Sequence, residues 1–403
     1  MPHDTAPFAP PNPAQTQPQI IGWAHSTFGR SEAAGVEQLM AEVIPAALDH
    51  AGQPAQAIDG VFVGVYNNGF SKQGFEGALA GMALTDLAQT PAVHLENACA
   101  TGSAALHAAL DFLAAGRGRV ALVIGAEKMT GVTSAEAGDV TLSACYRTEE
   151  AEVDGGFAGI FGQIAGRYFQ DNGDHSEALA MIAAKNHANG LRNPYAHMRR
   201  DFGVAFCNTV SDKNPRVAGP LRRTDCSLIS DGAVAMVLAL PEVAATAPRA
   251  IGFRARIQAN DALALSRRDP TAFDGARRAW AQALDTAGVG LMDLDLVETH
   301  DCFTIAELLE YEAMGLTPRG QGARAIRDGI VMRDGALPVN PSGGLKSRGH
   351  PLGATGVSQH VMAAMQLMGD AGEMQLPAPT LAGVFNMGGA AVANYVSVLE
   401  RLR

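Results

Sequence analysis

The chain has 403 residues, of which 47% are hydrophobic and 18% are charged, and its formal net charge is −11. This composition predicts a well-buried α/β enzyme and argues against a filament or a disordered protein. The negative charge argues against non-specific binding to nucleic acid, although a local basic patch would still allow an anionic ligand to bind.

Residues 1–18 are rich in proline and alanine and contain no lysine or arginine. We expect a flexible tail there, and neither a secretory signal nor a basic transit peptide. No stretch approaches the roughly 20 apolar residues of a membrane span, and the C-terminus is not a peroxisomal address. The five cysteines are widely spaced without a CxxC pair, which is typical of reduced thiols. We therefore expect a cytoplasmic protein with no membrane-spanning segment.

The first half of the chain, residues 19–249, alternates strand-like and helical patterns. Strands are expected at 19–23, 59–65, 90–95, 119–126 and 233–240, and helices at 33–51, 75–87 and about 104–116. Such alternation predicts a mostly parallel sheet that is covered by helices on both faces.

Residues from about 128 to 228 interrupt this alternation. They include the sequence Gly155-Gly-Phe-Ala-Gly159, a helical stretch at 176–191 and a polar segment at 212–223. We interpret this part as an inserted domain rich in loops, and loops on a rigid scaffold often shape a pocket.

The second half, residues 250–403, repeats the alternation. Strands are expected at 251–259 and 294–298, helices at 273–287, 306–314 and 357–367, and a closing strand pair at 380–385 and 390–399. The sequence Cys99-Ala-Thr-Gly102 introduces a helix in the first half, and Gly353-Ala-Thr-Gly356 introduces its counterpart here. Two similar halves packed face to face would bring both helix N-termini to one shared centre.

Cys99 is the first candidate for chemistry because it lies between a strand and an Ala-rich helix. Unpaired N–H groups and the helix dipole favour a thiolate there, below the usual thiol pKa of about 8.5. The alternative is that Cys99 is a small buried residue without chemical function.

Other candidates are weak when each is taken alone. His350 lies in a glycine-rich loop before a helix, and His300-Asp-Cys-Phe303 follows a strand, at the usual crevice position of an α/β sheet. A glycine turn at 386–389 offers N–H groups that suit an oxyanion and equally suit an ordinary hairpin. Cys145, Cys207 and Cys226 have no histidine or basic neighbour in a convincing context, so we expect them to be structural, and no zinc-binding pattern occurs.

Together these motifs resemble the thiolase family, and within it the sterol-carrier-protein type. The matching stretches are Asn97-Ala-Cys-Ala-Thr-Gly-Ser103, Ser230-Asp-Gly-Ala233, His300-Asp-Cys-Phe303, Asn340-Pro-Ser-Gly-Gly344, Gly349-His-Pro-Leu-Gly-Ala-Thr-Gly356 and Gly388-Gly389. The resemblance implies a five-layered αβαβα thiolase fold, made of two similar halves with an inserted loop domain. It also implies coenzyme A as a substrate, with no permanently bound cofactor and no metal.

The resemblance assigns a role to each candidate. Cys99 would be the nucleophile that carries the acyl group, and His350 would accept its proton. Cys302 would take the acid/base role that many thiolases give to a C-terminal cysteine, and His300 with His350 would hold the enolate oxygen. The resemblance also implies that the backbone at Asn386 and Gly388 binds an oxyanion, and that Ser227 and Gly349 contact the substrate. Asn386 stands where a glycine is usual in the family, so it adds a side chain to the pocket.

Acyl-CoA and CoA are the partners that the resemblance implies, together with a homodimer or tetramer. Four basic residues are candidates for the CoA phosphates: Arg222, Arg223, Lys346 and Arg348. One alternative is a ketoacyl-synthase-like condensing enzyme with a Cys-His-His set. Another is a thiolase-like subunit that acts only with a small partner protein or merely binds it. The order His300-Asp-Cys302 and the Gly-His-Pro sequence favour a thiolase.

Overall fold

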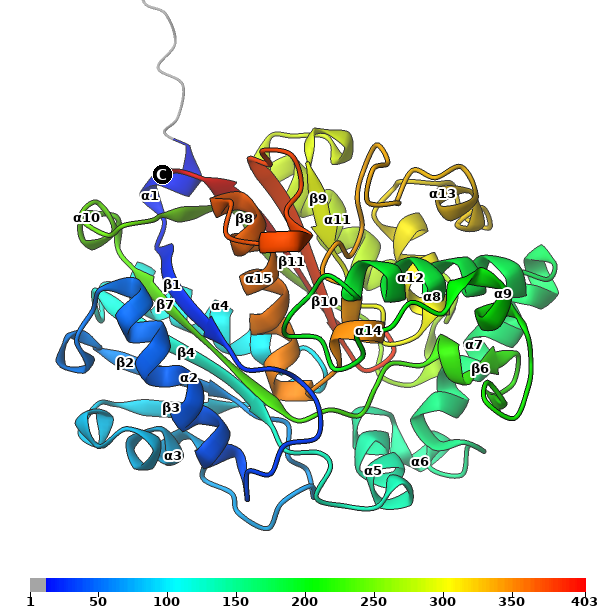
Figure 1. Cartoon of the computed structure of the whole chain (residues 1–403), viewed down its shortest axis with the longest axis horizontal. Coiled ribbons are helices and arrows are strands. Elements are labelled where there is room, and N and C mark those ends of the chain that lie inside the picture. Colours follow the sequence, from blue (N-terminus) through cyan, green and yellow to red (C-terminus); the bar gives the residue numbers. More distant parts are fainter. Residues whose placement is uncertain (1–11) are drawn as a thin grey trace, which may run out of the picture.

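The computed structural model describes residues 12–403, and one nine-stranded sheet runs through it (Figure 1). The strand order is β3-β2-β4-β7-β1-β8-β11-β10-β9. The strands are β1 Gln19–His25, β2 Gly60–Gly64, β3 Ala92–Leu95, β4 Val120–Glu127, β7 Gly232–Ala239, β8 Ile251–Asn260, β9 Leu296–Glu298, β10 Leu381–Gly388 and β11 Ala393–Arg401. A separate small hairpin consists of β5 Arg216–Ala218 and β6 Leu221–Arg222.

The sheet consists of two halves with the same connection pattern. They join where Ile20 of β1 pairs with Ile251 of β8. In the first half β2 lies between β3 and β4, parallel to both. In the second half β9 is parallel to β10 on one side, and Val339 forms an isolated parallel bridge to Val297 on the other. The single residue Val339 thus stands where the first half has the strand β3.

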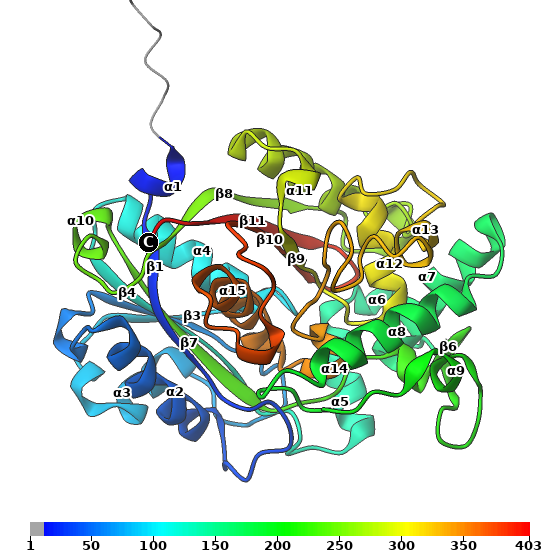
Figure 2. The same cartoon turned by 45° about the horizontal axis from the view of Figure 1, so that its top comes forward.

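Helices complete five layers, as Figures 1 and 2 show. Helices α2 Val36–Ala51 and α3 Glu76–Ala83 cover one outer face, and α11 Asp274–Ala287 and α12 Thr304–Ala313 cover the other. Helices α4 Thr101–Ala114 and α15 Leu352–Met368 lie between the two half-sheets. Three large apolar clusters fill these interfaces. The predicted αβαβα thiolase fold is therefore confirmed.

Helices α4 and α15 cross at the glycines of the repeated Ala-Thr-Gly sequence. A Cβ atom on Gly102 would lie 2.8 Å from the backbone nitrogen of Val357, and one on Gly356 would lie 2.3 Å from that of Ser103. Each helix therefore rests on the backbone of the other, and only glycine allows this approach. The sequence repeat corresponds to this close helix crossing.

The segment between β4 and β7 is more helical than expected. It carries α5 Ser134–Thr141, α6 Arg147–Glu150, α7 Gly156–Asn172, α8 Ser176–Gly190 and α9 Gly203–Asn208. Helix α7 contains four glycines in 17 residues, and each glycine in a helix costs about 1 kcal/mol relative to alanine. Close packing explains two of them, because a Cβ on Gly159 or Gly162 would lie 2.1 or 2.9 Å from a carbonyl oxygen of Asp154 or Ala218.

The prediction of a mostly parallel sheet is wrong. Strands pair antiparallel at β4–β7, β7–β1, β1–β8, β8–β11 and β11–β10, and parallel at β3–β2, β2–β4 and β10–β9. The strand–helix alternation predicts the parallel pairing correctly from β2 to β4. After the insertion the chain returns through β7 in the opposite direction, and the last two strands form a hairpin.

The N-terminal segment differs in part from the flexible tail that the sequence predicts. Of the tail predicted at 1–18, residues 1–11 lie outside the described residues, and the rest includes α1 Pro13–Thr16. Ala14 in this helix is fully buried against Gly252 of β8.

The remaining short helices are α10 Pro241–Ala244, α13 Ala323–Arg327 and α14 Gly344–Arg348. Among the described residues, no helix combines the length and apolar character needed to span a bilayer.

Candidate active site

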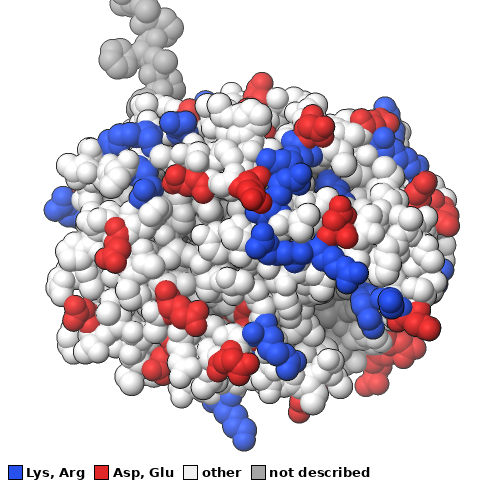
Figure 3. Space-filling view, viewed as in Figure 1, with Lys and Arg blue, Asp and Glu red and all other residues white. Residues whose placement is uncertain are grey.

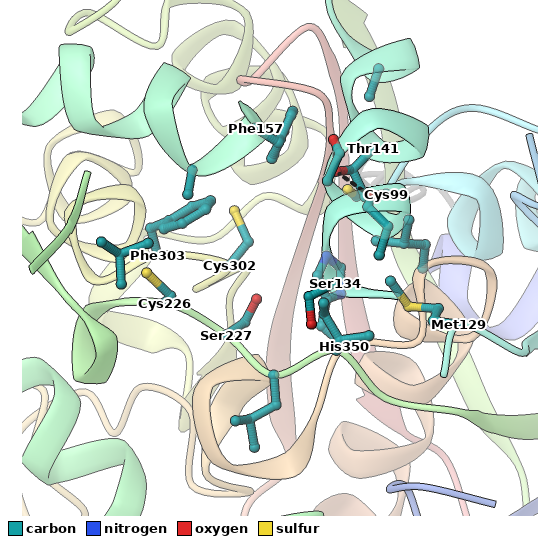
Figure 4. A pocket seen from close by; sticks show the side chains of 18 of the residues that line it. Cys99, Met129, Ser134, Thr141, Phe157, Cys226, Ser227, Cys302, Phe303 and His350 are labelled. Atoms are coloured by element: carbon teal, nitrogen blue, oxygen red, sulfur yellow. Dashed lines mark hydrogen bonds between the residues drawn. The ribbon is translucent and has the colours of Figure 1, made fainter. Parts of the chain in front are cut away.

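A cavity of about 230 Å³ lies where the N-terminal ends of α4 and α15 meet. Its wall includes Cys99, Cys302, His350 and Ser227, each from a loop that precedes a helix or strand. Figure 4 shows Cys302 and Ser227 on one side of the cavity and Cys99 on the other. Most of the remaining wall is apolar: Tyr66, Met129, Ala137, Ala144, Phe157, Ala158, Val217, Phe303 and Leu352.

Cys99 lies in the turn that leads from β3 into α4, with 4% of its surface exposed. Burial raises the pKa of its thiol to about 12, and the charge of Glu96 adds to this rise, whereas the backbone amide of Gly389 acts to lower the pKa. The expectation of a resting thiolate is therefore wrong. Helix α4 begins only at Thr101, and desolvation outweighs the favourable groups near the sulfur.

We expect alkylation of Cys99 by iodoacetamide to accelerate steadily with pH, without a plateau below about pH 10. Only the thiolate attacks this reagent, and with a pKa of about 12 each pH unit increases the thiolate fraction about tenfold. The rate can be measured by peptide mass spectrometry after timed exposure across this pH range. A plateau above about pH 7 would show a resting thiolate and contradict the expectation.

His350 precedes α15 and faces the cavity. Burial and the charge of Arg348 lower its pKa to about 3, so the imidazole is neutral at neutral pH. Its Nδ1 lies 2.7 Å from the Thr355 hydroxyl, which donates its hydrogen to the Pro351 carbonyl at 2.9 Å. Because the hydroxyl has one hydrogen, Nδ1 must donate to it, and Nε2 keeps a free lone pair. Nε2 has no protein partner among the described residues, so it can accept a proton.

His300 lies beside His350, with ring centroids 5.0 Å apart and an angle of 81° between the rings. Ligand atoms of Cys99, His300 and His350 all lie within 4.8 Å of one another. Burial, followed by the charges of His350 and Arg348, lowers the pKa of His300 well below 6.5. The site therefore joins one thiol to two neutral imidazoles, a set that can move a proton from sulfur and stabilise an oxyanion.

Cys302 lines the same cavity and is 2% exposed. Its carbonyl accepts a hydrogen bond from the backbone N–H of Ser227 at 2.9 Å, which ties the two cavity-lining residues together. Burial raises the pKa of the Cys302 thiol well above 9, and the charges of Cys99 and Glu310 add to this effect. The thiol therefore keeps its proton at neutral pH, as donation of a proton to carbon requires.

Asn386 and Gly388 do not lie in a turn as predicted. Strand β10 continues through both of them, and the turn follows it. The Asn386 side chain is fully buried and is not part of the cavity wall. The backbone amide that acts to lower the Cys99 pKa belongs to Gly389, which lies in that turn. Gly388 gives room beside the turn that carries Cys99, since a Cβ there would lie 2.5 Å from the Asn97 carbonyl oxygen.

Of the two predicted substrate contacts, the structure places only one on the cavity. Ser227 lines the cavity beside Cys302, whereas Gly349 is not part of the cavity wall. Gly349 has φ 109°, and a Cβ there would lie 2.6 Å from the Ser230 hydroxyl. Its role in this structure is to let the backbone turn tightly before His350.

The basic residues that were candidates for CoA phosphates are mostly interior. Arg222 and Arg348 form ion pairs with buried carboxylates at 2.8 and 3.1 Å, and Lys346 is 2% exposed. Arg223 is exposed. Figure 3 shows lysine and arginine side chains beside a hollow on this face of the molecule. The charge that could meet an anionic ligand therefore lies at the surface, outside the buried ion pairs.

The structure thus consists of two matching α/β halves with a cysteine–histidine cluster between them. The thiolase N-terminal domain matches residues 19–204, and the thiolase C-terminal domain-like family matches residues 258–401. The chain belongs to the thiolase family and is an acyltransferase.

Known proteins support this assignment. The chain is 34% identical over 385 residues to an acetyl-CoA acetyltransferase of Methanothermobacter thermautotrophicus, covering 95% of this chain and 99% of that one. It is 31% identical over 387 residues to human sterol carrier protein 2, covering 92% and 69%. The structure of an Ltp2-ChsH2(DUF35) aldolase shares the fold, with a TM-score of 0.80, 19% identity and coverage of 96% and 98%. The predicted likeness to the sterol-carrier-protein type is thus confirmed.

Proposed function

We propose that this protein cleaves a 3-ketoacyl-CoA with CoA, or condenses an acyl-CoA with acetyl-CoA, through an acyl group carried on Cys99. The observation that carries this proposal is the cluster of Cys99, His300 and His350, with the protonated thiol of Cys302 on the same cavity. One sulfur can attack while the other supplies a proton.

In the first step Nε2 of His350 accepts the Cys99 proton while the sulfur attacks the 3-keto carbon. The pKa values of about 12 and about 3 keep both groups neutral in the free protein. Proton transfer therefore accompanies the attack, because bond formation removes the charge from sulfur. The backbone amide of Gly389 acts to lower the pKa of this thiol, so it favours negative charge on the sulfur.

In the second step the bond between C2 and C3 breaks, and its electrons form the enolate of acetyl-CoA. His300 and the newly protonated His350 are placed to hold the enolate oxygen, and Cys302 donates a proton to C2. The CoA thiol then attacks the carbonyl of acyl-Cys99 and gives its proton to the Cys302 thiolate, while His350 returns its proton to the departing Cys99 sulfur. The shortened acyl-CoA leaves, and all three groups regain their starting protonation. Condensation follows the same steps in reverse.

The surroundings of the cavity suit the charged end of coenzyme A. A second depression shares Met129, Ser134, Ala137 and Ile229 with the cavity and adds Arg30 and His197. We assign the phosphates to this outer depression and the pantetheine arm to the inner cavity near Ser227. The apolar inner wall favours an acyl group without charge.

A homodimer is part of this proposal, because β3 presents an open sheet edge. Ala92, Val93 and His94 of this strand are exposed, and Phe75 nearby is 83% exposed. An exposed apolar sheet edge commonly pairs with another strand. Pairing of β3 with its copy would cover this edge and continue the sheet across the dimer.

A partner-dependent enzyme is the second candidate, since the fold is shared with a solved complex whose title names an aldolase of Ltp2 and ChsH2(DUF35). An assay of the purified protein alone separates the candidates. With acetoacetyl-CoA and free CoA, we expect the enolate absorbance of acetoacetyl-CoA to fall and two acetyl-CoA to form, without any added protein. A series of longer 3-ketoacyl-CoA substrates then gives the acyl preference, with Cys99→Ala as the blank. Activity with carrier-protein thioesters alone, or only after a partner is added, would contradict the proposal.

A further inference from the structure

The side chain of Asn386 links the nucleophile to His300. It is fully buried, and its Oδ1 accepts a hydrogen bond from the Ser103 hydroxyl at 2.7 Å. Its Nδ2 donates to the backbone carbonyl of Cys99 at 3.1 Å and lies 2.8 Å from Nδ1 of His300. One amide thus contacts α4, the turn that carries Cys99, and the loop after β9.

The Cys99 carbonyl determines which way this amide faces. A carbonyl oxygen can only accept, so the amide nitrogen must be the atom that meets it. The opposite orientation would place two carbonyl oxygens about 3.1 Å apart in a buried site. The Ser103 hydroxyl can donate or accept, so it adapts to either orientation and does not oppose this one.

This orientation in turn determines the tautomer of His300. The amide nitrogen only donates, so Nδ1 of His300 must accept. A neutral imidazole has one N–H group, which must then be at Nε2. His350 has the opposite arrangement, because Thr355 forces its hydrogen onto Nδ1. Within one site, His350 therefore presents a lone pair and His300 presents a donor.

The same three side chains would otherwise suit a metal ion. A thiol and two imidazoles within 4.8 Å are a donor set that zinc accepts. A metal-ligating histidine normally donates its other N–H to an acceptor. His350 has such an acceptor in Thr355, but His300 faces the donor of Asn386 instead. With hydrogen on Nε2, the lone pair of His300 is on Nδ1, where the Asn386 amide occupies it, so none is left for a metal.

We propose that Asn386 is a positioning residue that holds His300 with its hydrogen on Nε2. His300 then donates to the substrate oxygen, and its cluster with Cys99 and His350 does not form a zinc site. The role toward the substrate oxygen rests on the proposed function, whereas the tautomer of His300 does not.

The tautomer can be measured in the wild-type protein by long-range proton–nitrogen NMR on protein with ¹⁵N-labelled histidine. The signal of His300 is identified by its loss in His300→Gln. We expect Nε2 to carry the hydrogen and Nδ1 to show the shift of an unprotonated nitrogen. Hydrogen on Nδ1 overturns the proposal, whatever the activity of the protein and whether or not any Asn386 variant folds.

Asn386→Asp should reverse the arrangement, because a carboxylate accepts from Nδ1–H. We expect the His300 hydrogen on Nδ1, kcat for acetoacetyl-CoA cleavage lowered about 10²- to 10³-fold with little change in KM, and Co²⁺ affinity raised at least about tenfold. Cobalt serves as a probe for zinc, since its absorption spectrum reports a bound thiolate.

Asn394→Asp is the matched control on the neighbouring strand β11. The Asn394 amide contacts the carbonyls of Ala259 and Ala391, so its change should leave the His300 tautomer and the Co²⁺ affinity as in the wild type. If Asn386→Asp retains hydrogen on Nε2 alone and binds Co²⁺ no more tightly, the proposal is wrong. A wild-type protein with the expected tautomer but no activity on acetoacetyl-CoA would count against the proposed function and leave the tautomer assignment standing.

Discussion

Cys99→Ser is expected to lower cleavage of acetoacetyl-CoA by about 10⁴-fold or more, measured as kcat with the purified protein. The hydroxyl is nearly the same size as the thiol, so the start of α4 should be preserved. A serine hydroxyl is much harder to ionise than a thiol, and the base beside it is weak. His350 has a pKa of about 3, which suits transfer from sulfur during attack better than transfer from oxygen.

Cys207→Ser is the matched control for this variant. Cys207 is also fully buried, but it packs among α8 and α9 in the inserted segment, away from the cavity wall. The Cys207→Ser variant should retain the wild-type rate of acetoacetyl-CoA cleavage. Mass spectrometry of the wild type after incubation with acetyl-CoA should find one acetyl group on the peptide that contains Cys99. Equal rates for Cys99→Ser and the wild type would rule out the acyl-cysteine route.

The duplicated fold could be predicted because its signals are local in sequence. The strand and helix patterns and the repeated Ala-Thr-Gly sequence were sufficient to indicate two halves with both helix starts at one centre. Helix α7 was missed because its glycines lower helix propensity, and contacts with Asp154 and Ala218 compensate for them. Strand direction depends on where the chain returns after the insertion, which no local pattern records.

The candidate site was predictable at residues that stand in motifs. The structure brings Cys99, His350 and Cys302 to one cavity and places His300 beside Cys99 and His350, outside the cavity wall. The catalytic roles of these residues remain predictions. The contacts that orient these side chains could not be predicted from the sequence, because they join residues that are far apart in the chain. Asn386 meets the Cys99 carbonyl across 287 positions of the sequence. The raised pKa of Cys99 could not be predicted either, because desolvation depends on every segment that covers the thiol.

Gly356→Ala is expected to destabilise the protein by about 3 kcal/mol or to prevent folding, although alanine normally stabilises a helix. The new Cβ would lie 2.3 Å from the backbone nitrogen of Ser103 and 2.5 Å from Oδ1 of Asn386. The backbone of Ser103 belongs to α4, so relief requires the two central helices to separate. The loss should be visible as a lower midpoint of urea unfolding.

Gly166→Ala provides the control, because Gly166 is also helical and a Cβ there would have no neighbour within 4 Å. This change should raise stability by about 0.5 to 1 kcal/mol. The pair therefore compares one chemical change in two surroundings, a helix crossing and an open helix face. Cys99 and His350 stand at the starts of the two crossing helices, so any Gly356→Ala protein that folds should also lose about 10²-fold in kcat through misplacement of these groups. Equal stability of Gly356→Ala and the wild type would show that the α4–α15 crossing is looser than the Gly356–Ser103 distance indicates.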